Sequence, residues 1–278
     1  HLAQADQERA GQRPQRAMAL LQECVKADSG NAKAHLALSQ IAAELGRNDE
    51  AMKYADEAVR LDPSSDTYSK RAVIAQKYGY MEAALRDISV SLSMSANIEL
   101  YQWRARTFLG MRHYDLALKD ITSALELEPD NAELYDLRAH VNLLLGRLHY
   151  AQQDVERALR ISPRHVNLHL RLGQILALRG HYEQARQSLE PIRKDSPAWA
   201  HFAAGYIDCV RKRYDLAVRE FDGAVEKAGK LDSPLKGQAA FYGTVARAFS
   251  GLKKGHLPST MVKKKEKGKV YLCGLGVY

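Results

Sequence analysis

Apolar side chains recur along this chain with helical spacing, in short blocks that are separated by turn residues. The clearest block is the segment 131–163, NAELYDLRAHVNLLLGRLHYAQQDVERALRISP. On both sides of Gly146, apolar residues recur every three or four positions, which places them on one stripe of a helix with 3.6 residues per turn. The pattern therefore predicts two amphipathic helices that are joined by a tight turn at Gly146 and end at Pro163.

The same block repeats along the chain. Pro129, Pro163 and Pro197 stand 34 residues apart, and each closes a similar pair of apolar stripes. One helical hairpin cannot bury its own apolar faces, so that it needs neighbours of the same kind on either side. The repetition therefore predicts an all-α protein in which helical hairpins stack in sequence order.

This block resembles the tetratricopeptide repeat (TPR). In that family a small residue at position 8, a turn residue near position 15, Ala at positions 20 and 27 and Pro at position 32 form the packing signature. The block from Asn131 carries these features with Ala139, Gly146, Ala151 and Ala158. The resemblance implies a right-handed α-solenoid of stacked antiparallel helix pairs. It also implies a non-enzymatic scaffold or adaptor that holds a partner segment in a concave groove.

The signature divides the chain into four parts. We expect a partial N-terminal repeat over 1–31, about six helical hairpins over 32–230, a C-terminal capping helix over 235–252 and a basic, disordered tail over 253–278. Terminal caps are needed because an uncovered repeat exposes its apolar face.

Two positions depart from the signature. Gly110 stands two places early in its block, which predicts a different turn between the two helices there. Pro191 falls inside an expected second helix, where proline removes a hydrogen bond and clashes with the preceding turn. We therefore expect that helix to kink or to end early, near Glu190.

The formal net charge of +8 is concentrated at one end of the chain. The segment 252–278 contains seven Lys and one Glu, so the repeats themselves are close to neutral. A Lys-rich tail can contact nucleic acid or an anionic membrane, but it is more often a solvated segment. Apolar residues make up 46% of the chain, and none of its apolar runs approaches the roughly 20 residues that span a bilayer.

The residues that could carry catalysis or bind a metal do not form a recognisable motif. Cys24, Cys209 and Cys273 are too scattered for a disulfide framework or a zinc site. His165 and His169 are four residues apart, but no third ligand is near them. There is no P-loop and no HExxH pattern. We therefore expect no enzymatic activity, catalytic residue, metal, cofactor or small-molecule substrate.

In the family, certain positions of each first helix line the groove, and the resemblance implies that the same positions do so here. The candidate partner-binding residues are Lys70, Lys77, Trp103, Arg106, His140, Arg171, Gln174, Trp199, Phe202 and Tyr206, with Asp136 and Asn167 at neighbouring groove positions. Basic side chains in the middle and aromatic side chains toward the C-terminus suit an extended segment with acidic and hydrophobic residues.

Each candidate has a structural alternative. Trp103 can pack against the neighbouring helix, Arg106 and Arg171 can be solvated or salt-bridged, and the aromatic side chains after Pro191 can fill the gap that this proline leaves.

Two other functions stay open at this stage. One is a nucleic-acid-associated assembly protein that uses the basic tail. The other is the regulatory arm of a larger envelope polysaccharide or glycosyl-transfer machine. Self-association is also open. The visible residues favour a cytoplasmic location, and a periplasmic or other secretory compartment applies if a signal was removed before His1.

Overall fold

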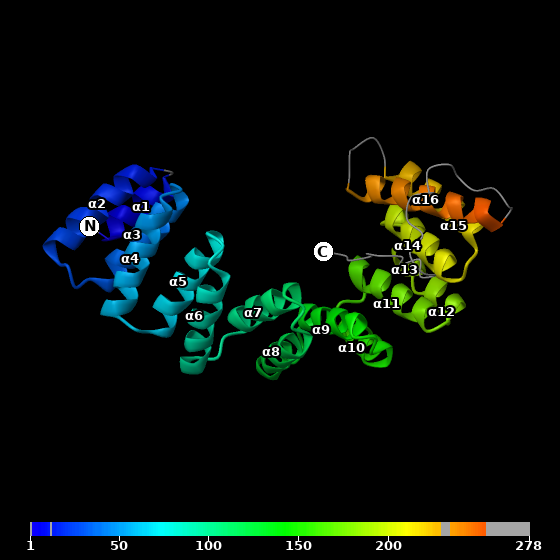
Figure 1. The fold of residues 1–278 in the computed structure, drawn as a ribbon, viewed down its shortest axis with the longest axis horizontal. Helices are drawn as coiled ribbons and strands as arrows, with labels where there is room; N and C mark the ends of the chain where they lie inside the picture. Colours follow the sequence, from blue (N-terminus) through cyan, green and yellow to red (C-terminus); the bar gives the residue numbers. More distant parts are fainter. Residues whose placement is uncertain (1, 12, 229–233, 254–278) are drawn as a thin grey trace. The chain divides into compact units, whose positions relative to one another are not determined.

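The computed structural model describes residues 2–11, 13–228 and 234–253, and all regular elements in these ranges are α-helices. Consecutive helices pack as antiparallel pairs, each followed by the next pair (Figure 1). The predicted all-α fold of stacked helix pairs is therefore confirmed. The chain divides into two compact units, His1–Pro129 and Asp130–Tyr278.

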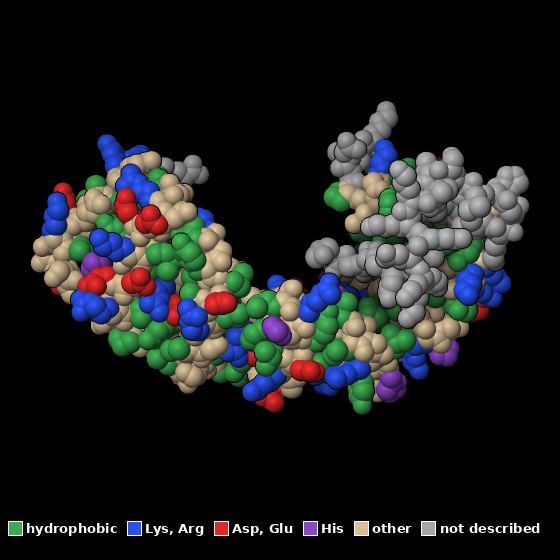
Figure 2. Space-filling model, viewed as in Figure 1, with side chains coloured by type: hydrophobic (Ala, Val, Ile, Leu, Met, Phe, Trp, Pro, Cys, Tyr) green, Lys and Arg blue, Asp and Glu red, His purple; other side chains and the backbone are tan. Residues whose placement is uncertain are grey.

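The described residues of the first unit, 2–11 and 13–129, form four helix pairs. They are α1 (Leu2–Ala10) with α2 (Pro14–Ala27), α3 (Ala32–Glu44) with α4 (Asn48–Leu61), α5 (Ser65–Lys77) with α6 (Met81–Met94), and α7 (Ile98–Gly110) with α8 (Tyr114–Leu127). On the visible face of this unit, Lys and Arg side chains lie among Asp and Glu side chains (Figure 2). This mixture agrees with a nearly neutral repeat surface.

The described residues of the second unit, 130–228 and 234–253, form three helix pairs and one further helix. The elements are α9 (Ala132–Leu144) with α10 (Leu148–Ile161), α11 (Val166–Leu178) with α12 (Tyr182–Gln187) and the short α13 (Glu190–Arg193), α14 (Pro197–Val210) with α15 (Tyr214–Lys227), and α16 (Pro234–Lys253). Helix α16 packs on α15 and also contacts α14. The Lys-rich tail predicted after it lies, from residue 254 on, outside the described residues.

Asparagine side chains start the first helix of three repeats. Asn31, Asn97 and Asn131 each accept a hydrogen bond from the backbone N–H three residues further on, at 2.9–3.1 Å. These bonds satisfy one of the N–H groups that have no partner within the helix. The sequence therefore specifies where each of these helices begins.

The turn between the two helices of a repeat needs one residue with positive φ. Gly46 and Gly146 occupy this position with φ of 72° and 71°, and Arg112 occupies it with φ of 62°. The backbone N–H of His113 donates to the carbonyl oxygen of Phe108 at 2.8 Å, as the equivalent groups do in the other repeats. The different turn predicted from Gly110 is therefore wrong: the turn is the same, and an arginine adopts the left-handed conformation.

Alanine side chains fill the closest contacts between helices. Ala51, Ala55 and Ala58 of α4 are fully buried, and so are Ala117 and Ala124 of α8. Small side chains let two helix backbones approach, and larger apolar residues then close the space around the contact. Ala51, Ala58, Ala117 and Ala124 stand at positions 20 and 27 of their repeats, where the resemblance implies alanine.

The helix around Pro191 is divided. Helix α12 ends at Gln187, and Pro191 lies in the first turn of α13, where its missing N–H needs no partner. Leu189 and Ile192 remain buried, at 0% and 2% exposed. The expected early end is present, three residues before Glu190, and the division keeps both apolar side chains in the core.

Candidate functional site

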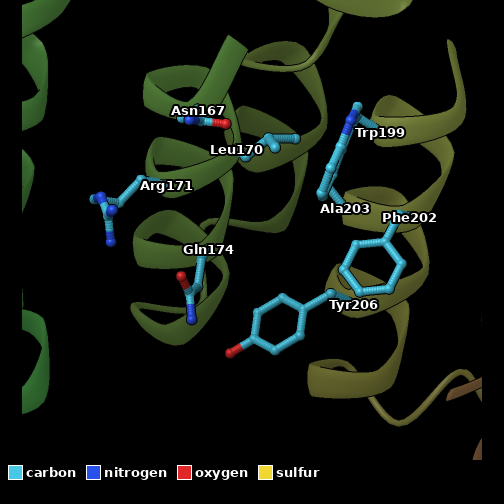
Figure 3. A pocket seen from close by; sticks show the side chains of 8 residues that line it. All are labelled: Asn167, Leu170, Arg171, Gln174, Trp199, Phe202, Ala203 and Tyr206. Carbon is cyan, nitrogen blue, oxygen red and sulfur yellow. The ribbon is translucent and has the colours of Figure 1, made fainter. Parts of the chain in front are cut away.

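A pocket lies between the first helices of two successive repeats, α11 and α14, within the second unit (Figure 3). It encloses about 100 Å³. This is the scale of a cavity that takes up one benzene-sized group. The lining residues are Asn167, Leu170, Arg171, Gln174, Trp199, Phe202, Ala203 and Tyr206.

One wall of the pocket is aromatic and comes from α14. Trp199, Phe202 and Tyr206 stand three and four residues apart, so that they share one face of the helix. Leu170 of α11 points toward this face, opposite Trp199 and Ala203 (Figure 3). Trp199 and Tyr206 are partly exposed, which leaves apolar surface open to a ligand.

Phe202 has a structural role as well. Its side chain is 8% exposed, and its ring centroid lies 5.7 Å from that of Phe221 and 5.8 Å from that of Tyr242. Trp199 meets it edge to face at 6.1 Å. Phe202 therefore forms the floor of the pocket and part of the core that α14 shares with α15 and α16. Packing, the alternative considered for the aromatic residues, describes Phe202 better than Trp199 or Tyr206.

The other wall is polar and comes from α11. Asn167, Arg171 and Gln174 are four and three residues apart and follow one face of this helix. Arg171 is 9% exposed and forms a two-pronged ion pair with Asp136 of α9, with Nη2 at 3.1 Å from Oδ2 and Nε bonded to Oδ1. The charge of Arg171 is therefore largely balanced within the protein.

Burial changes the pKa of two side chains near this wall, Tyr206 and His140. The pKa of Tyr206 is raised by burial, and a hydrogen bond with Gln174 opposes this in part. The pKa of His140 is lowered by burial and by the positive charge of Arg171, while Asp136 acts in the opposite direction. His140 is therefore predominantly neutral at pH 7, and the described residues of this wall offer a carboxylate no cation that lacks a partner.

The structure thus brings together five of the candidates predicted from sequence: Arg171, Gln174, Trp199, Phe202 and Tyr206. His140 lies near them through its interaction with Arg171. Leu170 was not predicted. The available signal was its spacing, because it lies three residues after Asn167 and four before Gln174 and so shares their helix face.

The other four candidates belong to the first unit and are not part of this pocket. Lys70 forms an exposed ion pair with Asp66 one helical turn earlier, at 2.8 Å. The ammonium of Lys77 donates a hydrogen bond to the carbonyl oxygen of Ala43. Both lysines therefore have partners within their own unit.

Trp103 and Arg106 differ in their surroundings. The indole N–H of Trp103 donates to Oε1 of Gln76 at 2.6 Å, and its ring packs against the core cluster of α5 and α6. Arg106 is exposed, and it makes no ion pair with another described residue. Packing between neighbouring helices accounts for Trp103.

Within residues 2–11, 13–228 and 234–253, no group of three or more His, Cys, Asp and Glu side chains is arranged to hold a metal ion. In the same ranges, none of the helices combines the length and apolar character needed to cross a membrane.

Comparison with known proteins agrees with the repeat architecture. Family models described as tetratricopeptide repeat match residues 9–74, 104–162 and 142–206. ETO1-like protein 1 from Arabidopsis thaliana is 35% identical over 83 residues, which is 30% of this chain and 9% of that protein. The chain thus spans less than a tenth of that relative.

Solved structures share the fold. The C-terminal part of a TPR repeat-containing protein from Cytophaga hutchinsonii has a TM-score of 0.68 at 12% identity, over 87% of this chain and 99% of that one. A TPR protein from Parabacteroides merdae has a TM-score of 0.59 at 16% identity, over 87% and 97%. Proteins with this repeat are generally interaction scaffolds and typically not catalytic. The chain belongs to the tetratricopeptide repeat family.

Proposed function

We propose that the second unit binds an extended segment of a partner protein and takes one apolar side chain of that segment into the pocket between α11 and α14. The observation that carries this proposal is the pairing of an open aromatic wall, Trp199 and Tyr206, with a polar wall on the facing helix. Aromatic side chains in a partly enclosed pocket supply most of the binding free energy in many protein interfaces.

The size of the pocket favours an extended segment, and not a folded domain, as the partner. A space of about 100 Å³ accepts one side chain of the partner, while the rest of the segment follows the polar wall. The amides of Asn167 and Gln174 each offer a donor and an acceptor, which are the groups that an extended peptide backbone needs. The pocket therefore selects an apolar or aromatic anchor within an otherwise adaptable sequence.

An acidic partner is not required. Arg171 already pairs with Asp136, so a carboxylate that approached it would compete with an existing ion pair. Leaving Asp136 unpaired in a partly buried site costs free energy. The proposal therefore assigns the main selectivity to the apolar anchor, in contrast to the acidic segment that the basic residues suggested.

The test is to select short peptides from a random display library on the full chain and to measure their affinity by calorimetry. Trp199→Ala and Tyr206→Ala should each weaken binding by about tenfold or more, since loss of an aromatic anchor costs roughly 2 kcal/mol. Trp103→Ala is the matched control. It removes the chain's other tryptophan, which lies in the first unit and outside the pocket, and it should leave the affinity unchanged.

Circular dichroism of each variant keeps a loss of folding distinct from a loss of binding. If the selected peptides bind the wild type, Trp199→Ala and Tyr206→Ala with equal affinity, the pocket is not the binding site. Selection of peptides without an aromatic or branched apolar residue would equally contradict an apolar anchor.

A further inference from the structure

We propose that the chain's own segment 270–278 occupies the pocket between α11 and α14 and competes there with an external partner. This inference rests on the proposed function, because it assigns an occupant and a regulation to the same site. Three features carry it: the open apolar wall of the pocket, the composition of the segment, and the distance that the chain has to cover.

The pocket presents apolar surface that the described residues leave uncovered. Trp199 and Tyr206 are partly exposed, and Leu170 faces them from α11. Two tyrosines, two leucines and two valines make up most of the segment VYLCGLGVY, which has no charged side chain. Such a segment gains free energy when its side chains leave water for an apolar pocket.

Helix α16, which precedes the segment in the chain, ends close to the pocket. Tyr242 of α16 contacts Phe202, the floor of the pocket, with ring centroids 5.8 Å apart. Helix α16 ends at Lys253, eleven residues after Tyr242. At about 1.5 Å per residue, its end lies about 16 Å further along the helix axis.

The stretch of chain between α16 and the apolar segment contains enough residues to span the distance from Lys253 back to the pocket. They number 16, from 254 to 269, and they include a run of lysines with glycine and one glutamate. A chain of this length has an average end-to-end distance of about 20–24 Å and reaches about 50 Å when it is extended. The path from Lys253 back to the pocket is therefore within reach.

Attachment to the same chain strengthens a weak contact. A short linker gives the tethered segment an effective concentration of the order of millimolar at the pocket. An isolated peptide with the same sequence would need that concentration in solution. A single apolar anchor of modest affinity is therefore enough to hold the segment in place, and an external partner must displace it.

The fluorescence of Trp199 reports the occupant. The chain has two tryptophans, so Trp103→Phe in the full chain leaves Trp199 as the single reporter. In this background, Tyr271→Asp with Leu272→Asp should shift the emission of Trp199 to longer wavelength and raise its acrylamide quenching about twofold, because water replaces the segment. Ser259→Asp with Thr260→Asp is the matched control, which adds two negative charges between α16 and the segment and should change neither value.

The peptides selected for the proposed function provide the second readout. They should bind the Tyr271→Asp, Leu272→Asp chain about three- to tenfold more tightly than the wild type, because the competing segment no longer occupies the site. Emission that does not change with protein concentration assigns the contact to the same molecule. Emission that does change assigns the pocket to the segment of a second copy and contradicts the inference.

Failure of the inference is distinct from failure of the proposed function. If the tail variant alters neither the Trp199 emission nor the peptide affinity, while Trp199→Ala still weakens the peptides, the tail is not the occupant and the proposed function stands. If the peptides are insensitive to Trp199→Ala but the tail variant shifts the emission, the pocket serves the chain's own segment alone.

Discussion

Arg104 binds Asp120 with two parallel hydrogen bonds, Nε to Oδ2 and Nη2 to Oδ1, each of 2.7 Å. Asp120 is 2% exposed, so its charge is out of contact with water. The pair joins the two helices of one repeat, α7 and α8. The same arrangement recurs, at a separation of 16 residues, in Arg71 with Asp87 and in Arg138 with Asp154.

Asp120→Ala should therefore destabilise the first unit strongly. The change leaves Arg104 as an uncompensated charge at a partly buried position, which costs about 3–5 kcal/mol of unfolding free energy. Urea denaturation followed by circular dichroism measures this loss. Lys70→Ala is the control, since it removes an exposed ion pair and should change the unfolding free energy by less than about 1 kcal/mol. Equal losses in the two variants would contradict the structural role of the buried pair.

The sequence contained the signal for these pairs. Tyr101, Arg104 and Asp120 have counterparts 33 residues earlier and 34 residues later. The arginine of each set lies over the ring of its tyrosine, with Arg104 at 6.0 Å from the ring centroid of Tyr101. The sequence does not by itself predict these residues to be buried, because charged residues in a repeat usually lie in solvent. The Tyr, Arg and Asp residues recur with the same period as the repeat, and this recurrence is the sequence feature that indicates a shared structural role.

The fold was predictable because small residues and turn residues act locally. Alanine at a helix contact, asparagine before a helix and glycine in a turn each have one physical reason to be where they are. The site was predictable only in part. The resemblance to the repeat family implied groove positions for Trp199, Phe202 and Tyr206. The burial of Phe202, however, depends on Tyr242 of α16, and the ion pair of Arg171 depends on Asp136, 35 residues earlier.

Arg112→Gly should stabilise the protein. Arg112 has φ of 62°, and the left-handed conformation costs a residue with a Cβ roughly 1–2 kcal/mol. Glycine removes this strain, but it also increases the conformational entropy of the unfolded chain, which lowers the unfolding free energy by about 0.5–1 kcal/mol. The expected net gain is about 0.5–1 kcal/mol, seen as a higher midpoint in urea. Gly146→Ala, at the equivalent turn with φ of 71°, should lower the midpoint, and a fall in both would contradict this account.

Two glycines in the second unit should respond in opposite directions to alanine. A Cβ on Gly205 would stand 2.8 Å from Cε1 of Phe221, which is 2% exposed and cannot move freely. Gly205→Ala should therefore cost about 1–3 kcal/mol of unfolding free energy. A Cβ on Gly237, within α16, would have no described neighbour within 4 Å, and Gly237→Ala should stabilise by about 0.5–1 kcal/mol. Thermal unfolding of both variants checks the difference, and a similar loss in both would show that packing against Phe221 is not the cause.

Cys209 should react slowly with alkylating reagents while the protein is folded. Burial raises the pKa of its thiol to about 11, with a smaller contribution from the charge of Asp208. The thiolate is the reactive form, so at pH 8 the folded chain should alkylate at Cys209 about 100-fold more slowly than the unfolded chain. The raised pKa of Cys209 also makes the stability of the fold depend on pH. The unfolded thiol ionises from about pH 9 while the folded thiol stays protonated, so this contribution to stability is lost as the pH rises toward 11. Iodoacetamide labelling with site-resolved mass spectrometry, in buffer and in denaturant, measures the ratio, and equal rates would show that the thiol is not protected in the fold.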